Sequence, residues 1–106
     1  MSPQSPENDY QDRIIGWARY NGWKVAHFRR AQRGGKWMTP VAADGKGFPD
    51  LVLVREPRLI FAEVKAGTSV SIEQRQWLDH LEGVPGIEVY VWKVKDWPQV
   101  QDILKR

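Results

Sequence analysis

The sequence predicts an α/β fold in which a small mixed sheet is flanked by helices, in the order αβββαβα. Two observations lead to this prediction. Apolar residues recur at helical spacing near both ends of the chain and in one central segment, while the segments between them alternate or are continuously apolar, as strands are. A short polar turn separates two of these strands and a helix-length segment separates the next two, which favours an antiparallel pair with a parallel neighbour.

The first expected elements are a helix and a strand. Residues 7–21 form an amphipathic pattern that Asn21 and Gly22 end. Residues 23–30 then alternate, which predicts a half-buried strand. The apolar face of the helix comprises Tyr10, Ile14, Trp17 and Ala18.

The middle of the chain is expected to hold a long loop and a hairpin. Residues 31–47 contain four glycines and show no regular period, which is typical of a functional or mobile loop. Residues 51–54 are a continuous apolar run, as in a strand covered on both faces, and residues 59–65 form the next strand. Because the polar turn over residues 55–58 is short, the two strands should pair antiparallel.

The last third of the chain predicts a helix, a strand and a short helix. Ser71 and Gln74 have the spacing of a capping box that opens a helix, and Gly83 helps to close it. The helix connects the preceding strand to a strand over residues 87–92, so that these two strands should be parallel. Asp96 is the expected N-cap of the short C-terminal helix.

Composition excludes several kinds of site. The chain of 106 residues has no cysteine, which excludes disulfides, thiolate zinc sites and cysteine nucleophiles. No apolar run approaches the roughly 20 residues that span a bilayer, and the N-terminus lacks the features of a secretory signal. We therefore expect a cytoplasmic protein with no membrane partner. Residues 1–6, with two prolines and two serines, should be a disordered lead-in to a single domain over 7–106.

Positive charge is concentrated in the predicted loop and just before it. Five basic residues between Arg29 and Lys46 face the single acid Asp44, a surplus of +4 against a net charge of +3 for the whole chain. Such a segment is expected of a protein that binds phosphate backbones, although a solvated basic loop has the same composition. Trp37 adds a candidate for contact with a base. The candidate DNA-binding residues are Arg29, Arg30, Arg33, Lys36, Trp37 and Lys46.

Asp50, Glu63 and Lys65 are candidates for a catalytic centre. Side chains two apart on a strand share a face at about 6–7 Å, so Glu63 and Lys65 should project together. In an antiparallel hairpin the start of one strand lies beside the end of the next, which brings Asp50 near them. Two adjacent carboxylates repel each other unless a cation or a proton lies between them, and Mg²⁺ is typically held by one or two carboxylates. The alternative is a solvated Glu–Lys pair at a strand edge.

This arrangement suits metal-assisted cleavage of a phosphodiester bond. Asp50 and Glu63 would hold the metal, together with the backbone carbonyl of Val64. A metal there would polarise the scissile phosphate and lower the pKa of bound water. Lys65 would orient or activate the attacking water and stabilise charge in the transition state.

The candidate centre lies within three motifs, Gly47-x-Pro49-Asp50, Glu63-x-Lys65 and Gln74-x-x-Trp77. Together they resemble the PD-(D/E)xK nuclease superfamily and, within it, the stand-alone VRR-NUC family of phage and bacterial nucleases. The resemblance covers most of the chain. It implies a restriction-endonuclease-like core and a Mg²⁺- or Mn²⁺-dependent endonuclease that cuts DNA, often structure-specifically. Similar stand-alone members are homodimers that resolve four-way (Holliday) junctions, an activity of DNA repair and recombination.

The resemblance also assigns roles to Glu7 and Gln74. Glu7 precedes the pair Tyr10-Gln11 in the first helix and would match an additional acid of the family, as a metal ligand or as a group behind the ligands. As a first-turn acid it would equally favour the helix dipole. Gln74 would line the site behind the acids, and completing the Ser71 capping box is an alternative that does not exclude this role.

Three functions compete at this point. The leading hypothesis is a homodimeric endodeoxyribonuclease that favours branched DNA. The second is a nuclease of flaps, single-strand junctions or linear duplex. The third is a catalytically silent DNA-binding module, which the presence of all three charged residues disfavours. Trp77 is expected in the core rather than on DNA, and His27 and His80 are expected to be polar surface residues.

Overall fold

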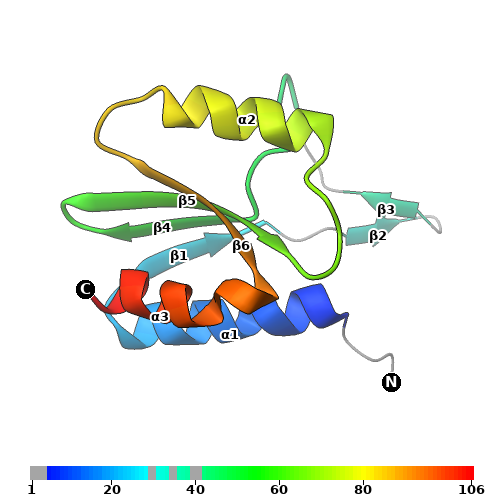
Figure 1. The fold of residues 1–106 in the computed structure, drawn as a ribbon. Helices are drawn as coiled ribbons and strands as arrows, with labels where there is room; N and C mark the ends of the chain where they lie inside the picture. Colours follow the sequence, from blue (N-terminus) through cyan, green and yellow to red (C-terminus); the bar gives the residue numbers. More distant parts are fainter. Residues whose placement is uncertain (1–4, 29–30, 34–35, 39–41) are drawn as a thin grey trace.

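The computed structural model describes residues 5–28, 31–33, 36–38 and 42–106, and it places a four-stranded sheet between helices (Figure 1). The strands lie in the order β1 (Lys24–His27), β4 (Leu51–Arg55), β5 (Arg58–Lys65) and β6 (Glu88–Lys93). Strand β4 pairs antiparallel with β1 and with β5, whereas β5 and β6 are parallel. The predicted α/β fold with its small mixed sheet, its hairpin and its parallel crossover is thereby confirmed.

Helices cover both faces of this sheet (Figure 1). On one face α1 (Pro6–Tyr20) and α3 (Trp97–Lys105) lie side by side, and on the other lies α2 (Ile72–Glu82). The core fills the space between the sheet and the α1–α3 pair. None of the helices in the described ranges is long and apolar enough to cross a membrane. Fully buried core residues include Ile14, Leu53, Ile60, Val64, Val100 and Leu104.

Helix α1 begins one residue before its expected start. The hydroxyl of Ser5 accepts the backbone N–H of Asn8 at 3.1 Å and so caps the helix. Pro6 fits the first turn because its missing N–H would have no intrahelical partner there. Ser5 and Pro6 thus belong to the helix and its cap, while residues 1–4 of the expected lead-in lie outside the described residues.

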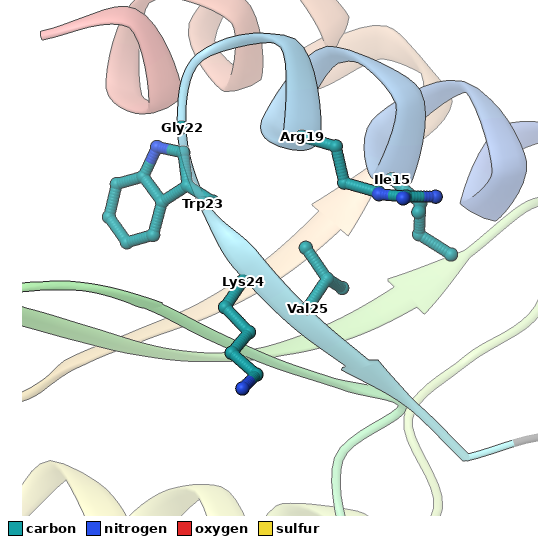
Figure 2. Close-up of a pocket in the computed structure, with 6 residues that line it drawn as sticks. All are labelled: Ile15, Arg19, Gly22, Trp23, Lys24 and Val25. Atoms are coloured by element: carbon teal, nitrogen blue, oxygen red, sulfur yellow. The ribbon is translucent and has the colours of Figure 1, made fainter.

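Strand β1 is shorter than the strand expected over residues 23–30. Its side chains alternate as predicted, with Val25 half-buried on the side of α1 and Lys24 exposed on the opposite side (Figure 2). In the described sheet β1 pairs with β4 alone and is therefore an edge strand. The end of the predicted strand, at Arg29 and Arg30, lies outside the described residues.

The prediction of a loop without regular structure over residues 31–47 was wrong in part. The segment contains β2 (Ala31–Arg33) and β3 (Lys36–Met38), which pair antiparallel as a separate two-stranded sheet. Strands of three residues are too short to show a hydrophobic period, which is why the sequence did not reveal them. Residues 42–49 do form an irregular segment, and this segment leads directly into Asp50.

The start of α3 differs from the expectation in one contact. A short 3₁₀ helix, η1 (Val94–Asp96), precedes it. Asp96 occupies the N-cap position, but its carboxylate accepts the backbone N–H of Lys93 at 2.9 Å and makes no capping bond to α3. The 3₁₀ turn explains the difference, because its own first N–H groups also need acceptors.

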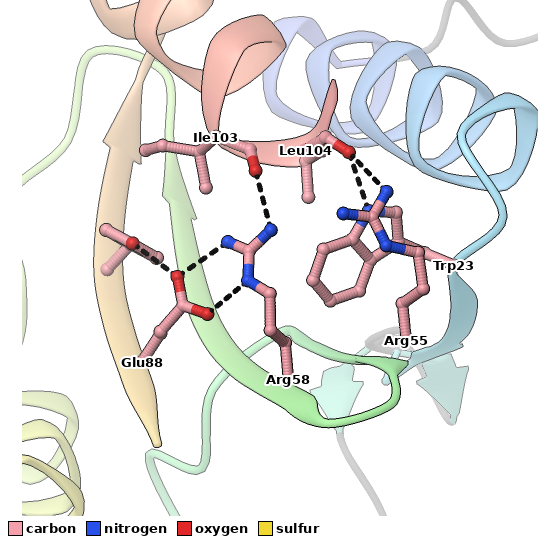
Figure 3. Close-up of polar contacts among 7 residues, drawn as sticks. Trp23, Arg55, Arg58, Glu88, Ile103 and Leu104 are labelled. Carbon is pink, nitrogen blue, oxygen red and sulfur yellow. Dashed lines mark hydrogen bonds and ion pairs between the residues drawn. The ribbon is translucent and has the colours of Figure 1, made fainter. Parts of the chain in front are cut away.

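The C-terminal end of α3 is fastened to the sheet by three donors (Figure 3). Arg55 Nη1 and Trp23 Nε1 donate to the carbonyl of Leu104 at 3.0 and 2.8 Å. Arg58 Nη1 donates to the carbonyl of Ile103 at 3.1 Å. These carbonyls have no partner within the helix, so the arginines supply the missing hydrogen bonds. The sequence indicated only a polar turn at residues 55–58 and gave no sign of this function.

Candidate active site

The three charged residues of the predicted centre come together at the end of the β4–β5 hairpin. Asp50 immediately precedes β4, and the antiparallel register of the two strands places it beside Glu63. Oδ2 of Asp50 accepts the backbone N–H of Val64 at 2.9 Å. Nζ of Lys65 lies 3.9 Å from Oε1 of Glu63. The hairpin therefore closes the sequence gap between Asp50 and the Glu-Val-Lys segment in the way that the sequence predicted.

Glu63 and Lys65 are charged residues in a nearly dry environment. Their side chains are only 1% and 9% exposed. They alternate along β5 with Ala62 and Val64, which belong to the core on the side of α1 and α3. Ionisable side chains withdrawn from water depend on one another and on any further polar partner, because bulk water cannot solvate either of them.

The carboxyl of Glu63 is poorly satisfied by the protein alone. Burial, the neighbouring carboxyl of Asp50 and the charge of Glu7 raise the pKa of Glu63 to about 10, against the lowering effect of Lys65. Oε2 of Glu63 is buried and has no hydrogen-bond partner among the described residues. A free carboxylate oxygen beside a second carboxylate is a donor set that fits a hard divalent cation such as Mg²⁺.

No third acid completes a ligand cluster in the part of the chain that the structure describes. There, no group of three or more His, Cys, Asp or Glu side chains is placed to hold a metal ion. Glu7 is near enough for its charge to raise the pKa of Glu63, which puts it in the neighbourhood of the centre. A direct ligand role for Glu7, and for the backbone carbonyl of Val64, stays a prediction.

Gln74 makes both of the contacts suggested for it, one in the capping box of α2 and one with the candidate centre. Its Oε1 accepts the N–H of Ser71 at 2.8 Å, and its backbone N–H donates to the Ser71 hydroxyl at 3.2 Å, which completes the capping box of α2. At the same time its Nε2 donates to Oε1 of Glu63 at 3.2 Å. One amide thus joins the start of α2 to the candidate centre.

This double contact predicts that the variants Gln74→Ala and Ser71→Ala will differ in activity. Ser71→Ala removes a capping hydroxyl and is expected to cost about 1 kcal/mol of stability without loss of DNA cleavage. Gln74→Ala weakens the same cap and also removes a donor to Glu63, so cleavage should fall about 10- to 100-fold. Thermal unfolding and cleavage rates measured on both variants test this. Equal activity of the two would mean that Gln74 acts only as a cap.

The turn before Asp50 is held against the first turn of α2. Gly47 has φ of +85°, and a Cβ atom at this position would lie 2.6 Å from the carbonyl carbon of Glu73 and 2.8 Å from the backbone nitrogen of Gln74. Only glycine fits both this backbone conformation and this close approach. Pro49, next to Asp50, is fully buried. The turn is therefore fixed on both sides of Phe48, by the close approach of Gly47 to α2 and by the burial of Pro49.

Phe48 lies at the centre of an aromatic cluster. The rings of Phe28, Phe61 and Trp77 meet it edge to face, with centroid separations of 5.5, 6.0 and 5.0 Å. The indole N–H of Trp77 donates to the carbonyl of Asp44 at 2.9 Å. These contacts tie β1, β5, α2 and the irregular segment together just before Asp50. Trp77 is half-buried and serves this packing, in keeping with the expected core role.

A buried pair that the sequence did not predict lies between α1 and β1. Oε1 of Gln11 is 2.6 Å from Nε2 of His27. Gln11 is buried and His27 half-buried, so His27 is not the surface residue that was expected. The pair depends on the packing of α1 against β1, and the sequence pointed to Gln11 only through the Tyr10-Gln11 pair of the family resemblance. His80, by contrast, is exposed as expected.

Among the predicted DNA-binding side chains, the structure describes that of Lys46. Lys46 is 80% exposed and forms an ion pair of 2.9 Å with Glu73 on α2. The other predicted contacts lie outside the described side chains, and their role stays a prediction. They are Arg29, Arg30, Arg33, Lys36 and Trp37.

An open groove at the far end of β1 is separate from the candidate centre (Figure 2). Strand residues advance about 3.3 Å each, so Lys24 in this groove lies roughly 10 Å along β1 from His27. No predicted catalytic residue lines it. The lining residues are Ile15, Arg19, Gly22, Trp23, Lys24 and Val25.

Comparison with protein families agrees with this geometry. A model of the VRR-NUC domain matches residues 4–96, nearly the whole chain. The chain belongs to the VRR-NUC family. A VRR-NUC domain implies a nuclease with DNA as its partner, so the family identified from the motifs is confirmed. The VRR-NUC match ends just before α3. No curated protein and no solved structure matches the chain.

Proposed function

We propose that this VRR-NUC protein is a metal-dependent endodeoxyribonuclease that hydrolyses phosphodiester bonds. The observation that supports the proposal is the free, buried Oε2 of Glu63 beside Asp50, with the ammonium of Lys65 at 3.9 Å from the same carboxylate. A purely structural Glu–Lys pair would satisfy both carboxylate oxygens or expose them to water. The three motifs also support membership of the PD-(D/E)xK superfamily.

Asp50 and Glu63 are the residues that would hold Mg²⁺ or Mn²⁺, with Glu7 and the Val64 carbonyl as further donors. When bound, such an ion supplies polarisation of the scissile phosphate and a lower pKa for a nearby water. The protein orients both carboxylates in advance, because Val64 N–H holds Oδ2 of Asp50 and the Gln74 amide holds Oε1 of Glu63.

Lys65 would hold the attacking water and stabilise negative charge on the phosphate. Its side chain is only 9% exposed, and its ammonium lies 3.9 Å from Oε1 of Glu63. A fixed cation in such a site stabilises the negative charge that develops in the transition state more strongly than one in water. Lys65 would also hold a water for attack through one of its N–H donors.

The proposed substrate is branched DNA, with four-way junctions as the leading candidate. A homodimer would present two centres to opposed strands, matching the two-fold symmetry of such a junction. The basic segment from Arg29 to Lys46 supports DNA binding. We propose a protein of bacterial or phage origin that acts in the cytoplasm.

Incubation with labelled four-way junction, flap and linear duplex, each with Mg²⁺, Mn²⁺ or EDTA, tests this function. We expect cleavage with either metal, none with EDTA, and faster cleavage of the branched substrates. Absence of cleavage on every substrate would support the silent DNA-binding module instead. Equal rates on branched and linear DNA would overturn the junction preference and leave the nuclease in place. Sedimentation of the protein with and without junction tests the homodimer.

A further inference from the structure

One face of β1 remains open beside the candidate centre. Lys24, Ala26 and Phe28 alternate with inward residues and are all exposed. Figure 2 shows the start of this alternation, with Lys24 directed away from α1. Helix α2 lies on the same face of the sheet, but it contacts β6, which is at the opposite edge of the sheet from β1. The row from Lys24 to Phe28 is therefore accessible.

Phe28 ends this row next to the catalytic turn. Its backbone N–H donates to the carbonyl of Asp50 at 2.9 Å, and its ring meets the ring of Phe48 at 5.5 Å. The residue is nevertheless 46% exposed. A large aromatic side chain is thus fixed by its backbone and by one ring contact, while much of its surface faces solvent beside Asp50.

The charge around Phe28 suits a nucleic-acid strand. Arg29 and Arg30 follow it directly in the sequence, and the exposed Lys24 lies about 13 Å away along the same row. On β4 the neighbours of Lys24 and Ala26 are Val54 and Val52, whereas the neighbour of Phe28 is Asp50, one of the proposed metal ligands. An exposed basic residue and an exposed aromatic ring in one row, followed in the sequence by two arginines, are features of a single-strand contact.

We propose that Phe28 stacks on an unpaired base next to the scissile phosphate and so selects DNA with an unstacked nucleotide at the cut. The proposal rests on the nuclease function proposed above and names the feature of the substrate that this site takes. A phenyl ring has no hydrogen-bonding group, so it accepts any base whose face is free. In a continuous duplex neighbouring base pairs cover those faces, whereas a branch point, flap or overhang leaves one accessible.

Binding of DNA in EDTA tests this without any need for cleavage. The probes are a duplex with a short flap, carrying 2-aminopurine at the branch point, and a fully paired duplex of the same sequence. We expect Phe28→Ala to weaken binding of the flap about 5- to 150-fold, to remove the 2-aminopurine signal change, and to leave duplex binding unchanged. Phe28→Trp should keep both the affinity and the signal.

Three controls make the result specific. Phe28→Leu keeps an apolar contact with Phe48 but has no aromatic face, so it should behave as Phe28→Ala. Tyr20→Ala removes an 82% exposed aromatic side chain at the far end of α1 and should change the affinity for neither the flap nor the paired duplex. Lys24→Ala should weaken the binding of flap and duplex alike. It should also reduce the slope of log affinity against log salt concentration by about 1.

The outcomes separate this inference from the nuclease proposal. Flap preference that persists in Phe28→Ala and Phe28→Leu, or equal loss on flap and duplex, would overturn the role of Phe28 even if the wild-type protein cuts DNA. Phe28-dependent flap binding by a wild-type protein that cuts nothing would support the role of Phe28 and overturn the nuclease.

Discussion

Glu63→Gln is expected to abolish cleavage and to make the metal-free protein more stable. Loss of one carboxylate from the proposed metal site should reduce the rate at least about 100-fold. In EDTA, however, the wild-type protein holds the buried carboxyl of Glu63 beside the half-buried carboxyl of Asp50, with Oε2 of Glu63 unpaired. A glutamine there can donate to Asp50 and still accept from Gln74. We therefore expect a gain of about 1–3 kcal/mol.

The gain should increase with pH. Folding raises the pKa of Glu63 from its ordinary value of 4.5 to about 10, so the folded protein holds this proton more tightly than the unfolded chain. The stability of the metal-free wild type is then fully present below the ordinary pKa and falls as the pH rises toward the raised value. Glutamine does not titrate, so its advantage should be larger near pH 9 than near pH 6.

Thermal unfolding of wild type and Glu63→Gln in EDTA at both pH values measures this difference. The matched control is Glu82→Gln, which makes the same substitution at an exposed position of α2. Addition of Mg²⁺ should raise the melting temperature of wild type and leave that of Glu63→Gln unchanged. A variant that still cuts DNA would refute the metal-site assignment. A variant less stable than wild type at high pH would refute the repulsion between the carboxyls.

Gly47→Ala is the second change with a large expected effect. An alanine at this position would have to adopt a left-handed backbone conformation. Its Cβ atom would also lie 2.6 Å from the carbonyl carbon of Glu73 and 2.8 Å from the backbone nitrogen of Gln74. Together the two effects should cost about 2–4 kcal/mol. Relief of the clash would move the turn away from α2 and with it Asp50, so cleavage should also fall.

Gly67 provides a close control for this prediction. Its φ of +87° is almost the same as that of Gly47, but a Cβ atom there would meet nothing within 4 Å. Gly67→Ala should therefore show only the backbone strain, about 1–2 kcal/mol, with cleavage kept. Chemical denaturation and cleavage rates of both variants separate the two contributions. An equal loss of unfolding free energy at the two positions would show that the close packing of the turn against α2 does not contribute to stability.

The hairpin and the three charged residues could be predicted because they depend on short-range patterns. An apolar run, a short turn and a second run determine an antiparallel pair, and the pair alone brings Asp50 to Glu63. The capping box of Ser71 and Gln74 could be predicted because it has a sequence signature, whereas the position of Gln74 behind the acids was implied by the family resemblance.

The contacts that escaped prediction depend on how distant elements pack. Gln11 meets His27 only because α1 lies against β1, and no periodicity encodes that pairing. Arg55 was assigned to a turn, although it caps a helix that begins more than 40 residues later. The β2–β3 hairpin has strands too short for a hydrophobic period.

The short sequence separations within the centre have a consequence for folding. Asp50 and Val64 are 14 residues apart, and Glu63 and Gln74 are 11 apart, whereas the bonds from Trp17 and Trp23 to α3 span 84 and 81 residues. The entropy lost on closing a loop increases with its length, so the catalytic segment closes at a lower entropic cost than the layer formed by α1 and α3. The carboxyls are thus brought together by local contacts, which do not depend on the long-range contacts that α1 makes with α3.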